Sequence, residues 1–394
     1  MKILFLATSF PRFKDDWVLP SLDVEARELA KEDEVIVISS AGTDTKNFEI
    51  RNNVKIIRFN YFIKKFQTLT YTGGMLSASQ KSLLSKILIP LFFISFLIKT
   101  LQYGRDCDVI HAHWTPSALI ALPLKILYKK PIVLSPLGGD IRGAIPNWFN
   151  KLAFKYSDVV LAPVPTIIDY VKKLGAEHKI NSLVKYCYDY DKFDKKDDIS
   201  GFKKEFNLKD ENVVSFIGRM DAFKDPITFI KAIPYILKKI RNVKFFIVGY
   251  GFLLDNIKKL VKELKLEKHV IITGPRKDVN IVLEASDIFV NLSPEENFFS
   301  VAIQEAMAKK VPCLLTNAGQ TEKIFTHKHD SYIVPVRDPR TTADGIIELL
   351  KNAKLRNKLT ENGLKLLKKH GFTRDEVING LNDLYKNVIE KYKR

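Results

Sequence analysis

Two cations follow a glycine at the point where a predicted strand, residues 213–217, gives way to a predicted helix. The segment reads GRMDAFKDP from Gly218 to Pro226, with its cations at Arg219 and Lys224. Arginine offers a planar fork of donors and lysine a compact charge, while a helix N-terminus adds free N–H groups. Proline favours the first helical turn. This combination suits a diphosphate, although a solvated loop in a lysine-rich chain would have the same composition.

A second candidate is a carboxylate inside an otherwise small and apolar helix. The sequence SPEENFFS at 293–300 leads into VAIQEAMA at 301–308, which places Glu305 in the second helical turn. A carboxylate among apolar neighbours is costly unless it is paired or bonds a ligand. Carboxylate oxygens are good acceptors for sugar hydroxyls. The alternative is a structural salt bridge, with Lys323 or Arg219 as the partner.

Two histidines, His111 and His113, lie two positions apart at the end of a predicted strand, so both can face the same side. A metal site would need a further ligand, and none with suitable spacing follows. We therefore expect no metal. A packed or hydrogen-bonded histidine is the simplest interpretation, with His113 as a candidate for substrate contact. Asp140, which follows two glycines after another strand, is a candidate for orienting an acceptor hydroxyl.

The elements that must position these residues follow the same alternation in both halves of the chain. Short apolar runs alternate with helix-period segments, which predicts βαβ units and mostly parallel sheets. The predicted strands include Lys2–Ala7, Val35–Ser39, Val109–Ala112 and Ile132–Leu134, and later Val213–Ile217, Lys244–Val248, Val270–Thr273, Ile288–Leu292 and Pro312–Thr316. Ligands of such sheets bind beyond the carboxyl ends of the strands. The sequence therefore predicts an α/β fold with two Rossmann-like, doubly wound domains.

Domain boundaries are expected where this alternation stops. Residues 1–188 are predicted to form the first domain and residues 210–371 the second. The linker between them, 189–209, is rich in Asp, Lys and Tyr and lacks apolar periodicity. Residues 372–394 are predicted to form a C-terminal helix.

Net charge, cysteine content and the length of apolar runs indicate which binding partners and which cellular compartment to expect. The 394 residues include 63 Lys and Arg against 45 Asp and Glu, a formal charge of +18 that favours an anionic partner. Three cysteines without CxxC spacing indicate a reducing compartment. The longest apolar stretch, Ile87–Ile98, has 12 residues, fewer than the roughly 20 that span a bilayer. We therefore expect a cytoplasmic protein.

Residues 51–100 concentrate positive charge. They contain eight Lys or Arg and neither Asp nor Glu, together with Phe62, Phe66 and an apolar run at 88–98. Basic residues beside aromatics and an amphipathic segment are typical of a membrane-binding surface. Peripheral contact with an anionic membrane at its cytoplasmic face is one interpretation, and a buried core helix is the other. Nucleic acid is not expected as a partner, because no RNA-binding motif is present.

Several motifs of the second half, taken in order, resemble the retaining glycosyltransferases of family 4. These motifs are GR-x4-K at 218–224, VGYG at 248–251, ITG at 272–274, EENFFSVAIQEAMA at 295–308 and NAGQTE at 317–322. The ending FTRDEV at 372–377, followed by a helix, is also similar. The first half is less similar, through SFPRF near its start, DVIHAHW at 108–114 and PIVLSPLGGDI at 131–141.

The resemblance implies a GT-B fold, in which two Rossmann-like domains face a cleft and the last helix crosses back to the first domain. The first domain would bind the acceptor and the second domain the nucleotide-sugar. Arg219 and Lys224 would neutralise the departing diphosphate. Glu305 would bond the ribose hydroxyls, and Glu296 would contact the donor sugar. The remaining donor-binding residues would be Gly218, Gly274, Pro275, Asn297, Phe298, Phe299, Ser300 and Val301.

Three positions depart from the family's pattern. The family separates two glutamates by eight positions, whereas Glu296 and Glu305 are nine apart, so either Glu296 or Asn297 takes the first role. Leu137 stands where the family often has a histidine. The usual glycine pair after the first strand is replaced by the bulky, charged segment 10–17, which we expect to shape the acceptor site. The candidates for acceptor or sugar contact are Arg12, His113 and Asp140.

The expected activity is transfer of a hexose, with retention, from a UDP- or GDP-sugar to a lipid-linked or glycan acceptor in polysaccharide or glycoconjugate synthesis. Stabilisation of an anionic leaving group is the main catalytic need, so neither a cofactor nor a metal is expected. An epimerase or phosphorylase is the enzyme alternative within this fold. A non-catalytic nucleotide-sugar-binding module is the alternative outside catalysis, since Leu137 and the shifted glutamate are compatible with lost activity.

Overall fold

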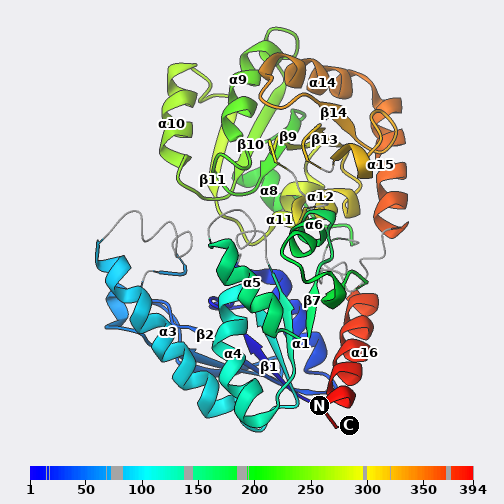
Figure 1. Ribbon diagram of the computed structural model, residues 1–394. Coiled ribbons are helices and arrows are strands. Elements are labelled where there is room, and N and C mark those ends of the chain that lie inside the picture. The colour runs from blue at the N-terminus through cyan, green and yellow to red at the C-terminus, as the bar shows by residue number, and fades with distance from the viewer. Residues whose placement is uncertain are drawn as a thin grey trace. The chain divides into compact units, whose positions relative to one another are not determined.

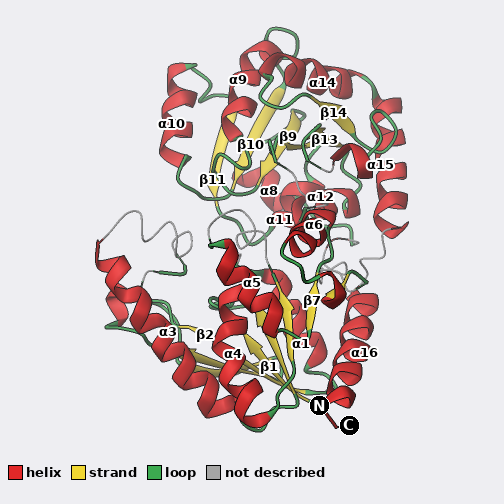
Figure 2. Cartoon of the chain, viewed as in Figure 1, coloured by secondary structure: helices red, strands yellow, loops and turns green. Residues whose placement is uncertain are grey.

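The computed structural model describes residues 1–14, 16, 18–67, 69–71, 83–136, 145–183, 193, 195–295, 300–319, 321–369 and 374–393. The chain divides into two compact units (Figure 1). One consists of residues 1–188 together with 372–394, and the other of residues 189–371. Each unit is a sheet covered by helices (Figure 2).

The first unit is built on an eight-stranded sheet in the order β3-β4-β2-β1-β5-β6-β7-β8. Its strands are β1 (Lys2–Leu6), β2 (Glu34–Ser40), β3 (Phe48–Arg51), β4 (Val54–Phe59), β5 (Val109–His113), β6 (Ile132–Ser135), β7 (Val159–Leu161) and β8 (Ile180–Asn181). All neighbouring strands are parallel except β3 against β4. Chain order reverses on either side of β1, so the loops after β1 and β5 flank a switch point, where such sheets bind ligands.

The helices of the first unit include one from the far end of the chain. They are α1 (Pro20–Leu29), η1 (Lys64–Phe66), α3 (Leu83–Gly104), α4 (Thr115–Tyr128), α5 (Asn147–Tyr156), α6 (Pro165–Lys173), η3 (Glu177–Lys179) and α16 (Arg374–Lys393). The stripe of α16 that includes Leu381 and Tyr385 is buried in one core with Phe5 and Val37 of the sheet. The prediction that the last helix returns to the first domain is confirmed.

The second unit has a six-stranded parallel sheet in the order β11-β10-β9-β12-β13-β14. Its strands are β9 (Asn212–Ile217), β10 (Val243–Val248), β11 (Val270–Gly274), β12 (Ile288–Asn291), β13 (Cys313–Thr316) and β14 (Tyr332–Val334). Its helices are α8 (Ser200–Glu205), α9 (Pro226–Leu237), α10 (Leu254–Glu263), α11 (Val279–Glu284), α12 (Val301–Ala308), α13 (Thr321–Ile324), α14 (Pro339–Lys351) and α15 (Ala353–Lys369). The switch point of this sheet lies between β9 and β12. The predicted α/β fold with two parallel-sheet domains is confirmed.

Two segments differ from their sequence-based description. The expected linker, 189–209, contains α8, and Phe202 of α8 is buried against Phe246, so this part packs on the second sheet. The apolar stretch at 87–98 belongs to a 22-residue helix, α3. Residues Ser85–Gly104 of α3 are long and apolar enough to cross a membrane by length and composition alone. The 12-residue count therefore underestimates this helix, because the apolar run is bounded by Lys86 and Lys99 whereas the helix continues through both.

Candidate functional site

The loops after β9 and β12 carry the predicted donor-site residues, and both lie at the switch point of the second sheet. The loop after β9 contains Arg219 and Lys224 and leads into α9. The loop after β12 leads into α12, which contains Glu305. Two adjacent strands of one parallel sheet thus place the predicted phosphate-binding and ribose-binding residues at the same sheet edge.

Main-chain hydrogen bonds hold the loop after β9 against the loop after β10. The Gly218 N–H donates to the Val248 carbonyl at 3.0 Å, and the Met220 N–H donates to the Tyr250 carbonyl at 2.7 Å. The Leu253 N–H returns a bond of 2.9 Å to the carbonyl of Met220. Because each of these bonds joins backbone atoms, the path of the chain around Arg219 depends little on the side chains beside it.

Gly249 makes this close approach possible. Its φ is +139°, and a Cβ there would lie 1.8 Å from the carbonyl oxygen of Gly218, far inside van der Waals contact. Its N–H donates at 3.0 Å to the carbonyl of Gly274, which ends β11 with φ +72°. The VGYG and ITG motifs are therefore parts of one backbone assembly beneath the Arg219 loop.

The two cations differ in their surroundings. Arg219 is 53% exposed, and its Nε lies 3.1 Å from Asp221 Oδ2. Lys224 is half-buried, and its Cγ would be 3.7 Å from a Cβ on Gly218, so its stem lies over that glycine. Asp225, with φ +48°, caps α9 by accepting from the Thr228 N–H at 3.1 Å. Both cations therefore precede the N-terminus of α9, where the Asp225 carboxylate already accepts the Thr228 N–H.

Side-chain hydrogen bonds join the residues at the end of β12 to the loop after β9. Ser293 Oγ donates to the Phe223 carbonyl at 2.5 Å, and Thr316 Oγ1 donates to the Ser293 carbonyl at the same distance. Asn291 Nδ2 donates to Ser300 Oγ at 3.2 Å, just ahead of α12. The residue before Lys224 is thus hydrogen-bonded to the strand end that leads to Glu305.

Only some of the remaining predicted donor residues lie within the described part of the chain. Glu305 is half-buried in α12, Val301 is exposed at the start of that helix, and Pro275 is exposed after β11. Glu296, Asn297, Phe298 and Phe299 lie outside the described residues, as do Leu137 and Asp140 of the first unit. The choice between Glu296 and Asn297 therefore stays a prediction.

In the first unit, His111 is a hydrogen-bonded core residue. Its Nε2 lies 2.7 Å from Ser135 Oγ, and its Nδ1 lies 2.6 Å from the Tyr385 hydroxyl. Glu25 Oε1 is 3.2 Å from the same Nδ1. Burial raises the pKa of Tyr385 well above its ordinary value, and the nearby Glu25 raises it further. This cluster joins α1, β5, β6 and α16 through polar side chains inside the core.

His113 is also buried, with its ring centroid 4.1 Å from that of His111. Burial, and then the charge of His111, lower the pKa of His113 well below its ordinary value. Its Nε2 has no hydrogen-bond partner among the described residues. Glu25, His111 and His113 offer one ligand atom each within 4.8 Å. Sequence spacing did not identify Glu25 as a neighbour of the two histidines, because it lies on α1, far from them in the chain. The one feature that marks it in the sequence is a carboxylate on the buried face of that helix.

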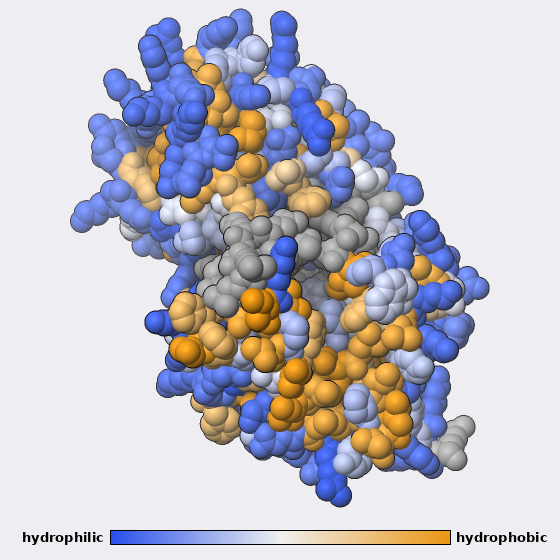
Figure 3. Space-filling view, turned by 60° about the vertical axis from the view of Figure 1, so that its left-hand side comes forward, coloured by the Kyte–Doolittle hydropathy of each residue, from blue (hydrophilic) through white to orange (hydrophobic). Residues whose placement is uncertain are grey.

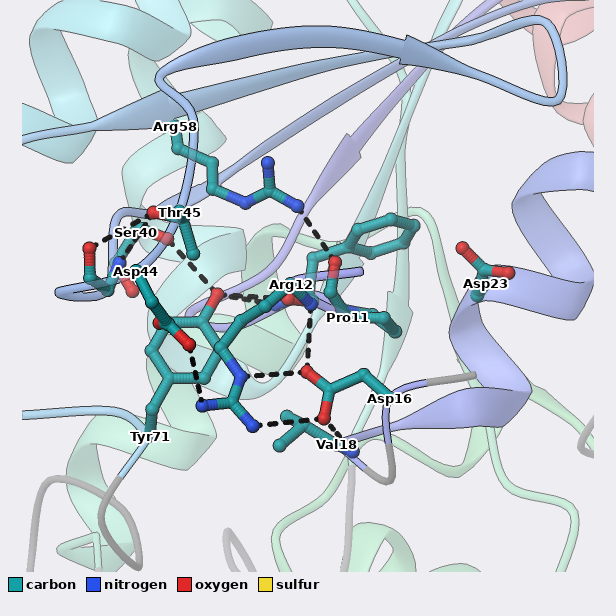
Figure 4. A network of polar contacts seen from close by, with 12 residues as sticks. Pro11, Arg12, Asp16, Val18, Asp23, Ser40, Asp44, Thr45, Arg58 and Tyr71 are labelled. Carbon is teal, nitrogen blue, oxygen red and sulfur yellow. Dashed lines mark hydrogen bonds and ion pairs between the residues drawn. The ribbon is translucent and has the colours of Figure 1, made fainter. Parts of the chain in front are cut away.

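Arg12 belongs to a polar network at the carboxyl ends of β1 and β2 (Figure 4). Its Nε and Nη2 donate to the Asp16 carboxylate at 2.8 and 3.1 Å, and its Nη1 reaches Asp44 at 3.4 Å. The hydrogen bond to Asp16, the largest contribution, raises the pKa of Arg12. The Tyr71 hydroxyl donates to the Phe10 carbonyl at 2.9 Å. Arg12 is thus held near the switch point of the first sheet.

Arg58 supports the same segment from within the core. Its side chain is fully buried, its Nη2 donates to the Pro11 carbonyl at 2.8 Å, and its Nη1 donates to Glu49 Oε1 at 2.8 Å. Arg51 Nη2 donates to the same Pro11 carbonyl at 2.9 Å. The Pro11 carbonyl, within the segment that replaces the glycine pair, is therefore held by two arginine side chains, a role that sequence reasoning did not assign to Arg51 or Arg58.

Comparison with known proteins identifies the class of enzyme. Residues 198–366 match the family model "Glycosyl transferases group 1". The chain is 28% identical over 297 residues to N-acetyl-alpha-D-glucosaminyl L-malate synthase of Bacillus anthracis, covering 73% of this chain and 77% of that protein. It is 24% identical over 309 residues to UDP-Gal:alpha-D-GlcNAc-diphosphoundecaprenol alpha-1,3-galactosyltransferase of Escherichia coli, covering 72% and 76%.

The fold is also shared with solved structures. The crystal structure of HepE from Anabaena in complex with UDP and glucose superposes with a TM-score of 0.76 and 17% sequence identity. The superposition covers 98% of this chain and all of that one, which establishes the common fold. The chain is therefore a glycosyltransferase with the GT-B fold, in which residues 198–366 are the part that matches the glycosyl transferases group 1 model.

Proposed function

We propose that the chain is a retaining, metal-independent glycosyltransferase of family 4. In this proposal it transfers a hexose from a UDP- or GDP-sugar to a lipid-linked acceptor at the cytoplasmic face of a membrane. The observation that carries the proposal is the loop 218–225, whose two cations precede the capped N-terminus of α9. A diphosphate is the donor group whose charge these two cations would complement.

The second unit would stabilise the leaving group. As the bond between the sugar C1 and the phosphate oxygen breaks, negative charge grows on the diphosphate. Arg219 offers paired N–H donors and Lys224 a compact charge to those oxygens, while the carboxylate of Glu305 accepts from ribose hydroxyls. The loop is already fixed by backbone hydrogen bonds, so little reorganisation is needed when the charge develops.

Retention follows from attack on the face that the diphosphate leaves. The acceptor oxygen forms a bond to C1 as the bond from C1 to the phosphate oxygen breaks, and the acceptor proton passes to a phosphate oxygen. The products are the glycosylated acceptor and the protonated nucleoside diphosphate. This route requires no carboxylate nucleophile; its main need is the stabilisation of the leaving diphosphate, which Arg219 and Lys224 would supply.

A lipid-linked acceptor is supported by the relatives and by charge. The similar Escherichia coli enzyme acts, by its name, on a diphosphoundecaprenol substrate. The formal charge of +18 favours anionic partners such as a lipid diphosphate and an anionic membrane. In this proposal the first unit supplies the acceptor side, with Arg12 and His113 near the switch point of its sheet.

A transfer assay tests the proposed function. Purified enzyme is incubated, with chelator present, with labelled UDP- or GDP-hexoses and a lipid extract that contains polyprenyl-diphosphate glycans. We expect transfer from one donor with retained anomeric configuration by NMR, about 100-fold or more slower in Lys224→Ala. Lys231→Ala, an exposed lysine of α9, is the matched control and should match the wild type. Inversion, or full activity in Lys224→Ala, would contradict the proposed mechanism.

A further inference from the structure

Helix α3 packs on the first sheet along one stripe only. Leu88, Phe92, Phe96 and Thr100 are buried at intervals of four residues. The Phe92 ring meets those of Phe59 and Tyr61 with centroids 5.0 and 5.2 Å apart, and Phe96 stacks on Phe59 at 4.9 Å. This stripe holds α3 to the unit along most of its length.

The opposite stripe of α3 is aliphatic and exposed. Ile87, Ile94 and Ile98 are 60%, 55% and 58% exposed, and Leu91 lies between them on the same face. The spacing of these residues follows the helical period, so they form a continuous ridge. A ridge of isoleucines in water is unfavourable, and contiguous apolar surface of this kind marks a contact site.

The end of α4 extends this ridge. Ile126 and Leu127 are 68% and 66% exposed. A Cβ on Gly104, the last residue of α3, would lie 2.2 Å from Leu124 Cδ1, so the ends of the two helices are in close contact. We call the exposed residues of this surface the α3–α4 face: Ile87, Leu91, Ile94, Ile98, Ile126, Leu127 and Tyr128. Figure 3 brings this side of the first unit forward and shows hydrophobic side chains gathered across it.

The charges on the two helices of the α3–α4 face are all positive, although the exposed Asp106 follows Arg105 in the turn after α3. Neither α3 nor α4 contains a single Asp or Glu, although the chain has 45. Lys86 and Lys129 are exposed at its edges, and the Arg105 guanidinium lies 5.6 Å from the Tyr128 ring centroid. The exposed segment FIKKF at 62–66 adds Lys64 and Lys65 next to β4. A partner of this face must accept aliphatic side chains at its centre and cations at its rim.

We propose that the α3–α4 face binds an anionic lipid bilayer, with α3 lying in the interface rather than crossing the membrane. The length of α3 alone would permit a span. A span would require lipid on all sides of the helix, whereas the stripe that includes Phe92 and Phe96 packs on the sheet. The exposed isoleucines fit the acyl boundary and the surrounding lysines fit lipid phosphates. This inference rests on the proposed function, which it deepens by naming the surface that meets the membrane holding the acceptor.

Vesicle binding tests the inference without any transfer reaction. The full chain is sedimented with vesicles of phosphatidylglycerol and phosphatidylcholine, and separately with vesicles of phosphatidylcholine alone. We expect binding to the anionic vesicles, reduced about tenfold or more in the double variant Ile94→Glu/Ile98→Glu. The matched control is Leu183→Glu, because Leu183 is 86% exposed beside β8 at the opposite edge of the sheet. Equal binding by the double variant and the wild type would overturn the inference.

A second variant tests the charged rim. Lys86→Gln/Lys129→Gln should reduce binding to anionic vesicles by about fivefold for each lysine, with no change in thermal melting. A second copy of the chain is the alternative partner of this face, and light scattering in the absence of vesicles tests for it. If the wild type is a dimer and Ile94→Glu/Ile98→Glu is a monomer, the face binds a second copy and the membrane inference is overturned.

Nucleotide binding separates this inference from the proposed function. Each variant is also tested for stabilisation by UDP and GDP, which depends on the second unit. Retained nucleotide binding and transfer without vesicle binding in the wild type would overturn the membrane inference alone. Vesicle binding without nucleotide binding or transfer would overturn the proposed function and leave the membrane-binding face standing.

Discussion

The strand ends of the two units are held in different ways. In the second unit, backbone hydrogen bonds and Gly249 fix the loops after β9, β10 and β11. In the first unit, the buried Arg58 and the ion pair between Arg12 and Asp16 hold the chain after β1. A backbone assembly tolerates changes of side chain, whereas a network of ion pairs depends on each member.

The difference agrees with where the family resemblance lies. The family model covers residues 198–366, within the second unit. A donor site that recognises a diphosphate can be shared by many enzymes, because backbone N–H groups and two cations suffice. An acceptor site must distinguish its own substrate from others. A network of side chains can provide that selectivity, but it differs from one enzyme to the next. We therefore expect variants of the two regions to fail differently.

The largest effect should come from breaking the backbone assembly. Gly249→Ala places a Cβ 1.8 Å from the Gly218 carbonyl, so the loop that carries Arg219 must move. We expect a loss of about 4 kcal/mol in the free energy of unfolding and loss of nucleotide binding, measured by denaturation and thermal shift. Gly201→Ala in α8, where a Cβ meets no atom within 4 Å, is the control. Unchanged nucleotide binding in Gly249→Ala would contradict the assembly.

A somewhat smaller effect should follow loss of the buried arginine. Arg58→Met removes a fully buried guanidinium from Glu49 and from the Pro11 carbonyl and leaves Arg51 as their remaining guanidinium partner. We expect this change to cost about 3 kcal/mol of unfolding free energy. The control is Lys55→Met on the same strand, whose exposed pair with Glu34 should contribute about 1 kcal/mol or less. Chemical denaturation measures both variants. Equal losses would show that the buried Arg58 does not stabilise the chain at Pro11.

The buried histidine should give the first unit a pH dependence. The pKa of folded His113 is well below that of an unfolded histidine, about 6.5. Below that pH the unfolded chain binds a proton that the folded chain does not, so stability falls as the pH falls. We expect a contribution to the slope of up to about 1.4 kcal/mol per pH unit, absent in His113→Gln. Denaturation between pH 7 and pH 5 measures it, and identical slopes would refute it.

The smallest effect on stability should come from the edge of the acceptor-side network. Arg12→Ala removes a part-exposed ion pair, so we expect about 1 kcal/mol or less of lost stability. Because Arg12 lies near the switch point of the first sheet, the KM for the acceptor should rise while nucleotide affinity stays the same. Steady-state kinetics with the acceptor and the nucleotide-sugar varied in turn measures the KM for each substrate. A change in nucleotide affinity alone would show that the donor and acceptor regions are not independent.

The local pattern of apolar and turn residues was sufficient to predict most of the fold. The helix predicted at 301–308 is α12 as observed, and the strands 213–217 and 244–248 fall within β9 and β10. Apolar runs and turn residues define such elements within a few neighbours. The return of the last helix followed from the family resemblance.

Long-range polar contacts could not be predicted. The meeting of Glu25, His111 and Tyr385 depends on three elements far apart in the chain, and nothing in the local pattern of α16 marks Tyr385 as a hydrogen-bond partner. Arg58 reads as an ordinary strand residue until Pro11 and Glu49 are placed beside it. Arg219 and Lys224 could be proposed as donor-site cations from the sequence, because that role needs only a loop and a helix start.

The central claim is that the second unit binds a nucleoside diphosphate through the β9 loop and Glu305. The most direct measurement is thermal stabilisation of the full chain by UDP, GDP, dTDP and CMP and their common sugar conjugates. At 100 times its dissociation constant, the correct ligand should add about 2.7 kcal/mol of stability. We expect one base to stabilise the wild type and the effect to disappear in Glu305→Ala. Stabilisation by none of these ligands, or equal stabilisation of Glu305→Ala, would contradict the account.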